Sequence, residues 1–214
     1  MIILIFIGLA IIFLLLSMLK KNEKKAIPKP AETDGKQVDL LNSEAACKPE
    51  EETKEMDPVK KLISETILKL DLYSAEAVEL MCGTCAQESG YGKFRHQLNG
   101  GPALGIFQCE PRTFDDIIKN FLFYDKELMA KITEISGEKQ LEASRLEVND
   151  VLAACICRIH YLRIEEAIPK SLEGWARYYK QYYNTPKGKA TEQEFIENYR
   201  RYVLKGTGNA GTLS

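Results

Sequence analysis

The chain has few histidines and almost no net charge. Its 214 residues include only His96 and His160, so a histidine-based metal site has few ligands to draw on. Lysine and arginine number 29 against 31 aspartates and glutamates, for a net charge of −2. No basic excess is present to neutralise a phosphate backbone, and we expect no binding of nucleic acid. Six cysteines are too few for a disulfide-dense scaffold, and we expect neither a metal nor a cofactor.

The composition changes along the chain and divides it into four segments. Hydrophobic residues make up 45% and charged residues 28%, which is typical of a globular protein and excludes wholesale disorder. An apolar run comes first, a proline-containing stretch with few apolar residues follows, and helical patterns begin at Asp57. We therefore predict a transmembrane anchor at 1–19, a flexible linker at 20–56, a folded domain at 57–205 and a disordered tail at 206–214.

The N-terminal run over 2–19 is uncharged and long enough for a helix to cross a bilayer. A cleaved signal peptide is the alternative, but no basic residue precedes the run and no small-residue cleavage site follows it. We therefore predict an uncleaved single-pass anchor. The lysines between Lys20 and Lys25 follow directly, and the positive-inside rule places the rest of the chain on the cytoplasmic side.

The segment after Asp57 carries the signals of a mainly helical domain. Apolar residues recur at helical spacing, and Ser, Thr, Asp or Asn residues stand where helices would begin. Residues 91–112 differ, because they are rich in glycine and contain Asn99-Gly100, a tight-turn signal that favours a small hairpin. The predicted helices cover 57–70, 74–90, 113–121, a stretch after 125, 149–162, 171–182 and 191–205.

Glu88 is the residue most suited to acid–base chemistry. It lies in the last turn of the predicted helix 74–90, at the margin of that helix's apolar stripe. Partial burial and the negative end of the helix dipole both raise the pKa of a carboxyl group. A carboxylic acid that stays protonated near neutral pH is a general acid. The alternative is an ordinary solvated glutamate at a helix end.

The surroundings of Glu88 resemble the lytic transglycosylase and goose-type lysozyme superfamily, over residues 57 to about 200. In that family a catalytic Glu-Ser pair closes a helix, a Gly-Leu-Met-Gln type segment follows, a Pro and a Thr open the next helix, and a Tyr-Asn pair lies in the cleft wall. The matching positions here are Glu88-Ser89, Gly105 to Gln108, Pro111 with Thr113, and Tyr183-Asn184. The resemblance implies a lysozyme-like fold, mainly α with a small glycine-rich hairpin or loop insert.

The resemblance also implies cleavage of the MurNAc-β-1,4-GlcNAc bond of peptidoglycan, with Glu88 as general acid and base. The substrate-binding residues that it implies are Ser89, Gly105, Phe107, Gln108, Tyr183 and Asn184. Departures from the family pattern occur at Phe107, Cys109 and the segment 185–189, and they bear on subsite preference.

Two outcomes of the reaction remain open. A lytic transglycosylase needs no second carboxylate, because the sugar's own 6-hydroxyl attacks. A hydrolytic lysozyme needs one, and the candidates are Glu110, Asp115 and Asp116. No second carboxylate stands out, so the transglycosylase is favoured.

Aromatic and cysteine residues allow further readings. Phe107, Tyr178, Tyr179 and Tyr183 offer flat faces to sugar rings, although core packing explains the helical pair Tyr178 and Tyr179 equally well. Buried free thiols are the expected state of the cysteines. The alternatives are a disulfide, a redox site at Cys82 and Cys85, or a metal site completed by Cys155 and Cys157.

The expected partners are peptidoglycan glycan strands, a membrane that holds the N-terminal helix, and other virion or envelope proteins. Peptidoglycan lies outside the cytoplasmic membrane, whereas the lysines favour the inside. Either the chain is a bacteriophage protein that meets the wall on entry or lysis from a virion or viral membrane, or it is a bacterial inner-membrane protein to which the orientation rule does not apply. A rival function is a non-catalytic wall-binding or structural virion protein.

Overall fold

The computed structural model describes residues 56–97, 100–186 and 188–205. The chain separates into two units, Met1–Glu51 and Glu52–Ser214, and all described residues belong to the second. The predicted anchor at 1–19, the linker at 20–56 except Met56, and the tail at 206–214 lie outside the described residues. Among the helices that the structure does describe, none combines the length and the apolar character needed to cross a membrane.

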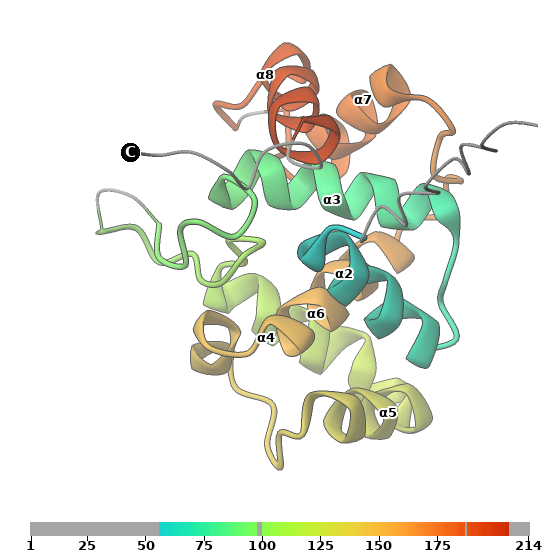
Figure 1. Cartoon of the computed structure of the whole chain (residues 1–214). Helices are drawn as coiled ribbons and strands as arrows, with labels where there is room; N and C mark the ends of the chain where they lie inside the picture. The colour runs from blue at the N-terminus through green and yellow to red at the C-terminus, as the bar shows by residue number, and fades with distance from the viewer. Residues whose placement is uncertain (1–55, 98–99, 187, 206–214) are drawn as a thin grey trace, which may run out of the picture. The chain divides into compact units, whose positions relative to one another are not determined.

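The domain is mainly α, as the sequence predicted (Figure 1). Its described residues form α-helices, two short 3-10 helices (η3 and η4) and one π-helical segment (η5). In chain order these are α2 (Pro58–Lys69), α3 (Ala75–Ser89), α4 (Pro111–Asn120), η3 (Leu122–Tyr124), α5 (Lys126–Ser136), η4 (Ala143–Glu147), α6 (Asp150–Leu162), α7 (Leu172–Tyr182), α8 (Glu192–Asn198) and η5 (Tyr199–Leu204).

Six of the seven predicted helix starts are confirmed by their capping hydrogen bonds. The Ser74 hydroxyl accepts from the backbone N–H of Ala77 at 3.0 Å, which satisfies a donor that the first turn of α3 leaves free. At α8, Thr191 and Glu194 form both bonds of a capping box. Side chains that cap in the same way are Asp57 for α2, Asp125 for α5, Asn149 for α6 and Ser171 for α7.

Two predicted boundaries are corrected, and one short helix is new. Helix α4 begins at Pro111, two residues before the predicted Thr113, because proline at the first position already has the φ angle of a helix. The last predicted helix ends as α8 at Asn198, and the chain continues to Leu204 as the π-helix η5. The 3-10 turn η4 was not predicted.

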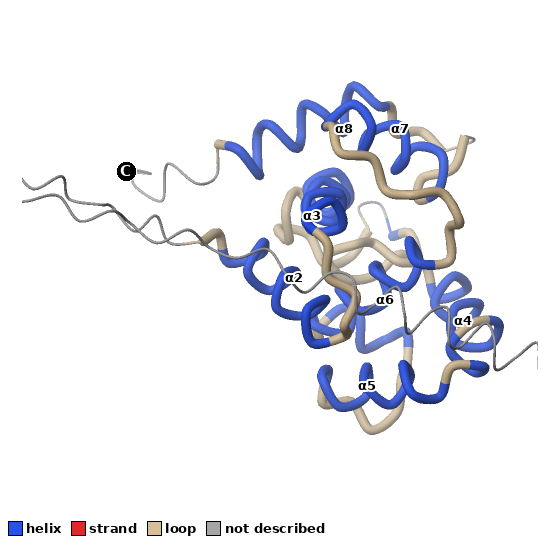
Figure 2. Tube along the Cα trace, turned by 90° about the vertical axis from the view of Figure 1, so that its right-hand side faces the viewer, coloured by secondary structure: helices blue, strands red, loops and turns tan. Residues whose placement is uncertain are grey.

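The predicted hairpin in 91–112 is replaced by an irregular loop. Its pairing is reduced to two isolated antiparallel bridges, His96 with Leu104 and Leu104 with Cys109, and Figure 2 shows no strand in the described part of the chain. Asn99 of the predicted turn lies outside the described residues. Gly105 holds the loop against η4, since its φ is +74° and a Cβ at this position would lie 2.2 Å from the Leu146 carbonyl oxygen.

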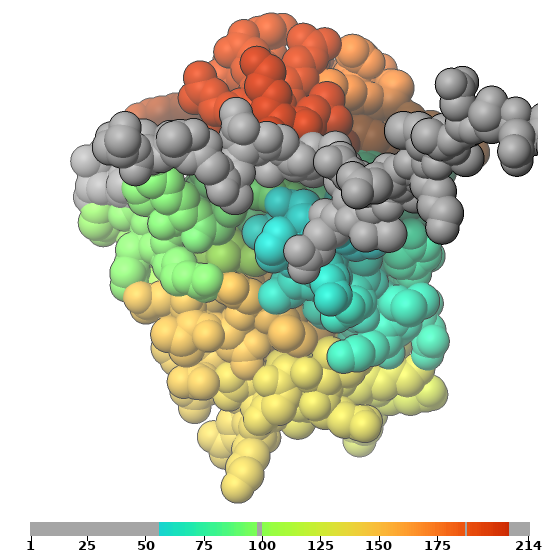
Figure 3. All heavy atoms as spheres, in the orientation of Figure 1, coloured from blue at the N-terminus to red at the C-terminus, as the bar shows by residue number. Residues whose placement is uncertain are grey.

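Helix α3 runs through the middle of the domain. It has α7 and α8 on one side and α2, α6 and α4 on the other (Figures 1 and 2). The space-filling view places α8 and α7 at one end and α5 at the opposite end (Figure 3). The closeness of α8 depends on Gly83, because a Cβ there would lie 2.2 Å from the Phe195 ring. Helix α3 is therefore buried over most of its length.

The five cysteines that the structure describes are all buried, as expected for small apolar residues, while Cys47 lies outside the described part. Burial raises the pKa of the Cys85 and Cys109 thiols to about 12, so both are protonated at neutral pH. A redox role at Cys82 and Cys85 needs a thiolate, and this environment disfavours one.

Candidate active site

A cavity of about 740 Å³ opens beside the C-terminal end of α3. Its wall is assembled from that helix end, the irregular loop, the start of α4, the end of α6 and the turn after α7. Most of the lining side chains are polar. The lining residues are Gln87, Glu88, Phe94, His96, Gln97, Ala103, Gln108, Cys109, Glu110, Arg112, Thr113, His160, Tyr182, Tyr183, Asn184, Thr185 and Lys189.

Glu88 lies in this wall and is partly buried, as the helical pattern predicted. Burial raises the pKa of its carboxyl group from 4.5 to about 7. The Tyr179 hydroxyl donates a 2.6 Å hydrogen bond to Glu88 Oε1, which favours the carboxylate and partly offsets the effect of burial on the pKa. Near neutral pH the group therefore exchanges a proton readily. The bond to Oε1 leaves Oε2 for a ligand in the cavity.

Polar side chains continue from Glu88 to the cavity rim. The Asn184 side chain lies close enough to the buried Tyr179 hydroxyl to act on its pKa, in the direction opposite to burial. Lys180 Nζ in turn donates to Asn184 Oδ1 at 3.0 Å and to the Gly188 carbonyl oxygen at 2.7 Å. Lys180 thus holds the Asn184 amide by its oxygen and ties it to the turn that contains Gly188.

Three of the predicted binding residues line the cavity with Glu88: Gln108, Tyr183 and Asn184. Gln108 has a φ of +46° and its Nε2 donates to the Gly105 carbonyl oxygen at 2.8 Å. The Tyr183 hydroxyl donates to the Phe107 carbonyl oxygen at 2.7 Å, which ties the turn after α7 to the loop. Three of the six predicted binding positions therefore share the cavity wall with Glu88, and their role in binding stays a prediction.

The other three predicted binding residues do not reach the cavity. Ser89 is 0% exposed, and its hydroxyl donates to the carbonyl oxygens of Ile106 and Cys85 and accepts from the Gly92 N–H. Gly105 is buried against η4, and Phe107 is 1% exposed in the core. Ser89 ties the loop to α3, Gly105 packs against η4 and Phe107 packs in the core, so none of the three lines this cavity.

The predicted aromatic faces are also corrected. Core packing is right for Tyr178, whose hydroxyl donates to the Glu166 carbonyl oxygen outside this cavity. Tyr179 is 1% exposed, so its ring offers no face to a sugar. Its hydroxyl acts on the site only by its hydrogen bond to Glu88. Tyr183 lines the cavity, with its ring stacked on Tyr179 at 5.9 Å between centroids.

The three candidates for a second catalytic carboxylate differ in their position relative to the cavity. Glu110 lines the cavity and pairs with Arg112, with 2.6 Å between Oε2 and Nε. Asp115 pairs with Lys119 on the exposed face of α4, and Asp116 binds Arg163 and Asn120. Of the three, only Glu110 shares the cavity with Glu88.

The sequence reasoning missed several lining residues, among them Phe94, His160 and Lys189. His160 Nε2 lies 3.0 Å from the Tyr182 carbonyl oxygen, and burial lowers the pKa of its ring. No motif marked these residues, because they come from separate segments that meet only in the folded chain. Within the described ranges, no group of three or more His, Cys, Asp or Glu side chains is arranged to hold a metal ion.

The chemistry available at this site is proton transfer by Glu88 in a polar cavity. The residues around it supply hydrogen bonds and an ion pair. Comparison with protein-family models, curated proteins and solved structures gives no match to this chain.

Proposed function

We propose that this protein is a peptidoglycan lytic transglycosylase with a lysozyme-like fold and Glu88 as its general acid and base. The observation that carries the proposal is the raised pKa of Glu88, about 7, in the wall of a polar cavity beside Tyr179. A carboxyl group with this pKa is able to donate and to recover a proton at neutral pH.

The first step cleaves the bond between MurNAc C1 and the GlcNAc O4 oxygen. Glu88 donates its proton to O4, the C1–O4 bond breaks with its electron pair going to oxygen, and positive charge develops on C1 and the ring oxygen. The GlcNAc unit leaves with a free 4-hydroxyl. Burial supports this step because it raises the pKa of Glu88 to about 7, so a substantial fraction of the carboxyl group carries a proton near neutral pH.

The second step closes the sugar on itself. The 6-hydroxyl oxygen of the same MurNAc bonds to C1, and its proton passes to the Glu88 carboxylate, which restores the acid. The product carries a 1,6-anhydro end and no water is consumed. Gln108 and Asn184 line the cavity and supply amide groups for sugar hydroxyl and acetamido groups.

Hydrolysis by the same fold is the second candidate, and Glu110 favours it. This carboxylate lines the same cavity, where it would activate a water in a muramidase. Its Oε2 also lies 2.6 Å from Arg112 Nε in the same cavity wall. Mass spectrometry of released muropeptides separates the two, since anhydro ends indicate the transglycosylase and reducing ends the hydrolase.

Zymography on purified cell wall tests the enzyme against the rival of a non-catalytic wall-binding virion protein. We expect clearing by the wild-type chain and a loss of about 1,000-fold or more in rate for Glu88→Gln. Absence of clearing by folded wild-type protein would refute the enzymatic proposal.

We also propose that residues 1–19 anchor the enzyme in a viral or bacterial inner membrane, and that the domain acts on the periplasmic wall during phage entry, lysis or wall remodelling. The apolar run at 2–19 supports this proposal. Protease treatment of intact spheroplasts tests orientation, because digestion of the linker from outside contradicts the cytoplasmic placement that the lysines indicate.

A further inference from the structure

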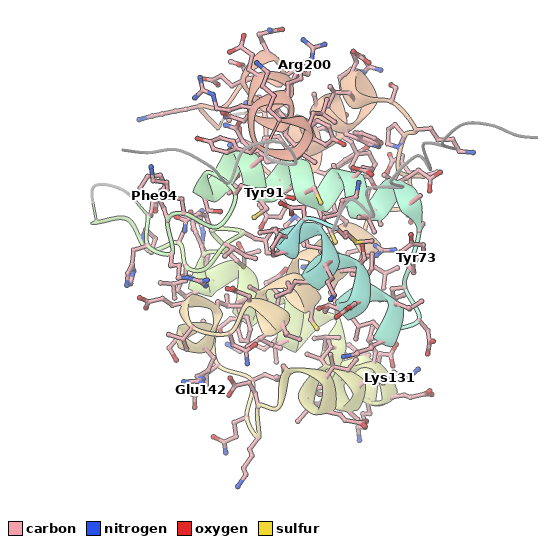
Figure 4. All side chains as sticks on the ribbon, in the orientation of Figure 1. Tyr73, Tyr91, Phe94, Lys131, Glu142 and Arg200 are labelled. Atoms are coloured by element: carbon pink, nitrogen blue, oxygen red, sulfur yellow. The ribbon has the colours of Figure 1, made fainter. Side chains whose placement is uncertain are left out.

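Phe94 presents an aromatic ring in the wall of the Glu88 cavity. The ring is 39% exposed, although it belongs to the large apolar residues that usually lie inside. In Figure 4 it lies at the outer edge of the loop after α3, whereas Tyr91, three residues earlier, lies inward beside α2. Its position therefore differs from that of an aromatic residue serving the core.

The position of Phe94 is set by the end of α3. Its backbone N–H donates to the Ser89 carbonyl oxygen at 2.9 Å. Its ring lies over Gly90, where a Cβ would be 3.5 Å from the ring edge, and Lys93 Nζ lies 5.5 Å from the ring centroid. Glu88 and Phe94 are thus both placed by the C-terminal turn of α3 and its glycine cap.

The other aromatic rings of the cavity wall are already engaged. Tyr183 stacks on Tyr179 and bonds the Phe107 carbonyl oxygen, and Tyr182 packs edge-on against Tyr178 at 4.7 Å between centroids. Phe94 makes no ring–ring contact in the described part of the chain. Among the described residues, Phe94 is therefore an exposed aromatic residue of the cavity wall whose ring has only Lys93 Nζ over it and no aromatic partner.

Side-chain amides in the same wall have unused hydrogen-bonding groups. Gln87 Oε1 accepts from Asn198, which leaves its Nε2 as a donor, and Gln97 Oε1 accepts from the Ala103 N–H, which leaves a second donor. Gln108 Nε2 donates to Gly105, which leaves Oε1 as an acceptor. An acetamido group needs one donor for its carbonyl oxygen and one acceptor for its N–H.

We propose that Phe94 is the sugar platform of this cavity, stacking on the pyranose ring of an N-acetylhexosamine unit while Gln87, Gln97 and Gln108 bind its acetamido group. The apolar C–H face of a pyranose matches an exposed aromatic ring, and fixed amides at the edge select the substituted sugar. This inference rests on the proposed function, since it names the part of the glycan strand that the cavity recognises. It moves the stacking role from Phe107, which is buried, to Phe94.

Binding of a β-1,4-linked N-acetylglucosamine hexamer to the full-length Glu88→Gln variant tests the platform by calorimetry. Adding Phe94→Ala is expected to weaken the affinity at least about tenfold, and Phe94→Tyr to preserve it. Phe123→Ala is the matched control, because Phe123 is 59% exposed on η3 and does not line the cavity. We expect that control to bind like its parent.

A glucose hexamer with the same linkage tests the amides, and we expect it to bind at least about tenfold more weakly than the N-acetylglucosamine hexamer. Circular dichroism spectra establish that each variant is folded. An unchanged affinity for Phe94→Ala, or a parent that binds no hexamer at millimolar concentration, overturns the inference.

The enzymatic proposal and the Phe94 sugar platform are refuted by different results. If the wild-type chain cuts cell wall but Phe94→Ala binds normally, the platform is wrong and the enzyme stands. If the wild-type chain does not cut cell wall but hexamer binding depends on Phe94, the reaction is wrong and the sugar site stands.

Discussion

Because burial raises the pKa of Glu88, ionisation of its carboxyl group lowers the free energy of unfolding. The substitution Glu88→Gln removes this effect, since glutamine does not ionise. The carboxyl group has a pKa of 4.5 in the reference state and about 7 in the folded protein. The folded state therefore binds this proton more tightly than the unfolded chain. The stabilisation from the bound proton is complete below about pH 4.5 and is lost as the pH rises through 7. The loss amounts to about 3 kcal/mol, since each pH unit between the two values is worth about 1.4 kcal/mol.

Glutamine keeps the shape of the side chain and its acceptor for the Tyr179 hydroxyl, but it carries no charge at any pH. We therefore expect Glu88→Gln to be more stable than wild type by about 3 kcal/mol at pH 8 and by less than about 0.5 kcal/mol at pH 4.5. Urea unfolding of both proteins at both pH values, followed by circular dichroism, measures the difference.

Glu142→Gln is the matched control, because Glu142 is exposed and lies outside the cavity. The gain at pH 8 is expected at position 88 and not at 142. A stability difference for Glu88→Gln that is the same at pH 4.5 and pH 8 would refute the reasoning, since it would show that the proton of Glu88 is not held by the fold.

Three further changes probe the surroundings of Glu88. Tyr179→Phe removes the hydrogen bond that favours the carboxylate, so the pKa of Glu88 rises further and the limb of the pH–rate profile that reports it moves to higher pH; an unmoved limb contradicts the bond's role. Lys180→Met removes the hydrogen bonds that hold Asn184 and the turn after it, and we expect kcat/KM to fall about tenfold through a higher KM, with recovery in Lys180→Arg. Equal activity of the wild type and both variants would show that Lys180 does not position Asn184. Cys82→Ser buries a hydroxyl in an apolar site, so we expect it to lower the free energy of unfolding by about 1–2 kcal/mol and to leave cell-wall cleavage unchanged. If the folded variant no longer cleaves cell wall, the redox alternative at Cys82 and Cys85 is favoured.

Local patterns predicted the helices well, because the signals act within one or two turns. Ser74 and Asn149 cap helices through bonds to residues three positions away, and such bonds depend on no distant part of the chain. The half-buried position of Glu88 followed from the helical period in the same way. The predicted hairpin was wrong because a turn signal specifies only a bend in the chain. A β-ladder also needs two segments that pair by backbone hydrogen bonds, and the packing of the whole loop decides whether they do.

The sequence by itself determined which segments are helical, where α3 ends, and that an acidic side chain stands at the edge of its buried face. Only the tertiary structure decided what that acid meets. Its partner Tyr179 is 91 positions away along the chain, and no local pattern pairs them. The tertiary structure likewise places Phe107 in the core and Phe94 in the cavity wall. Residue type alone does not predict this difference, because the burial of a side chain depends on how the helices and the loop pack around it.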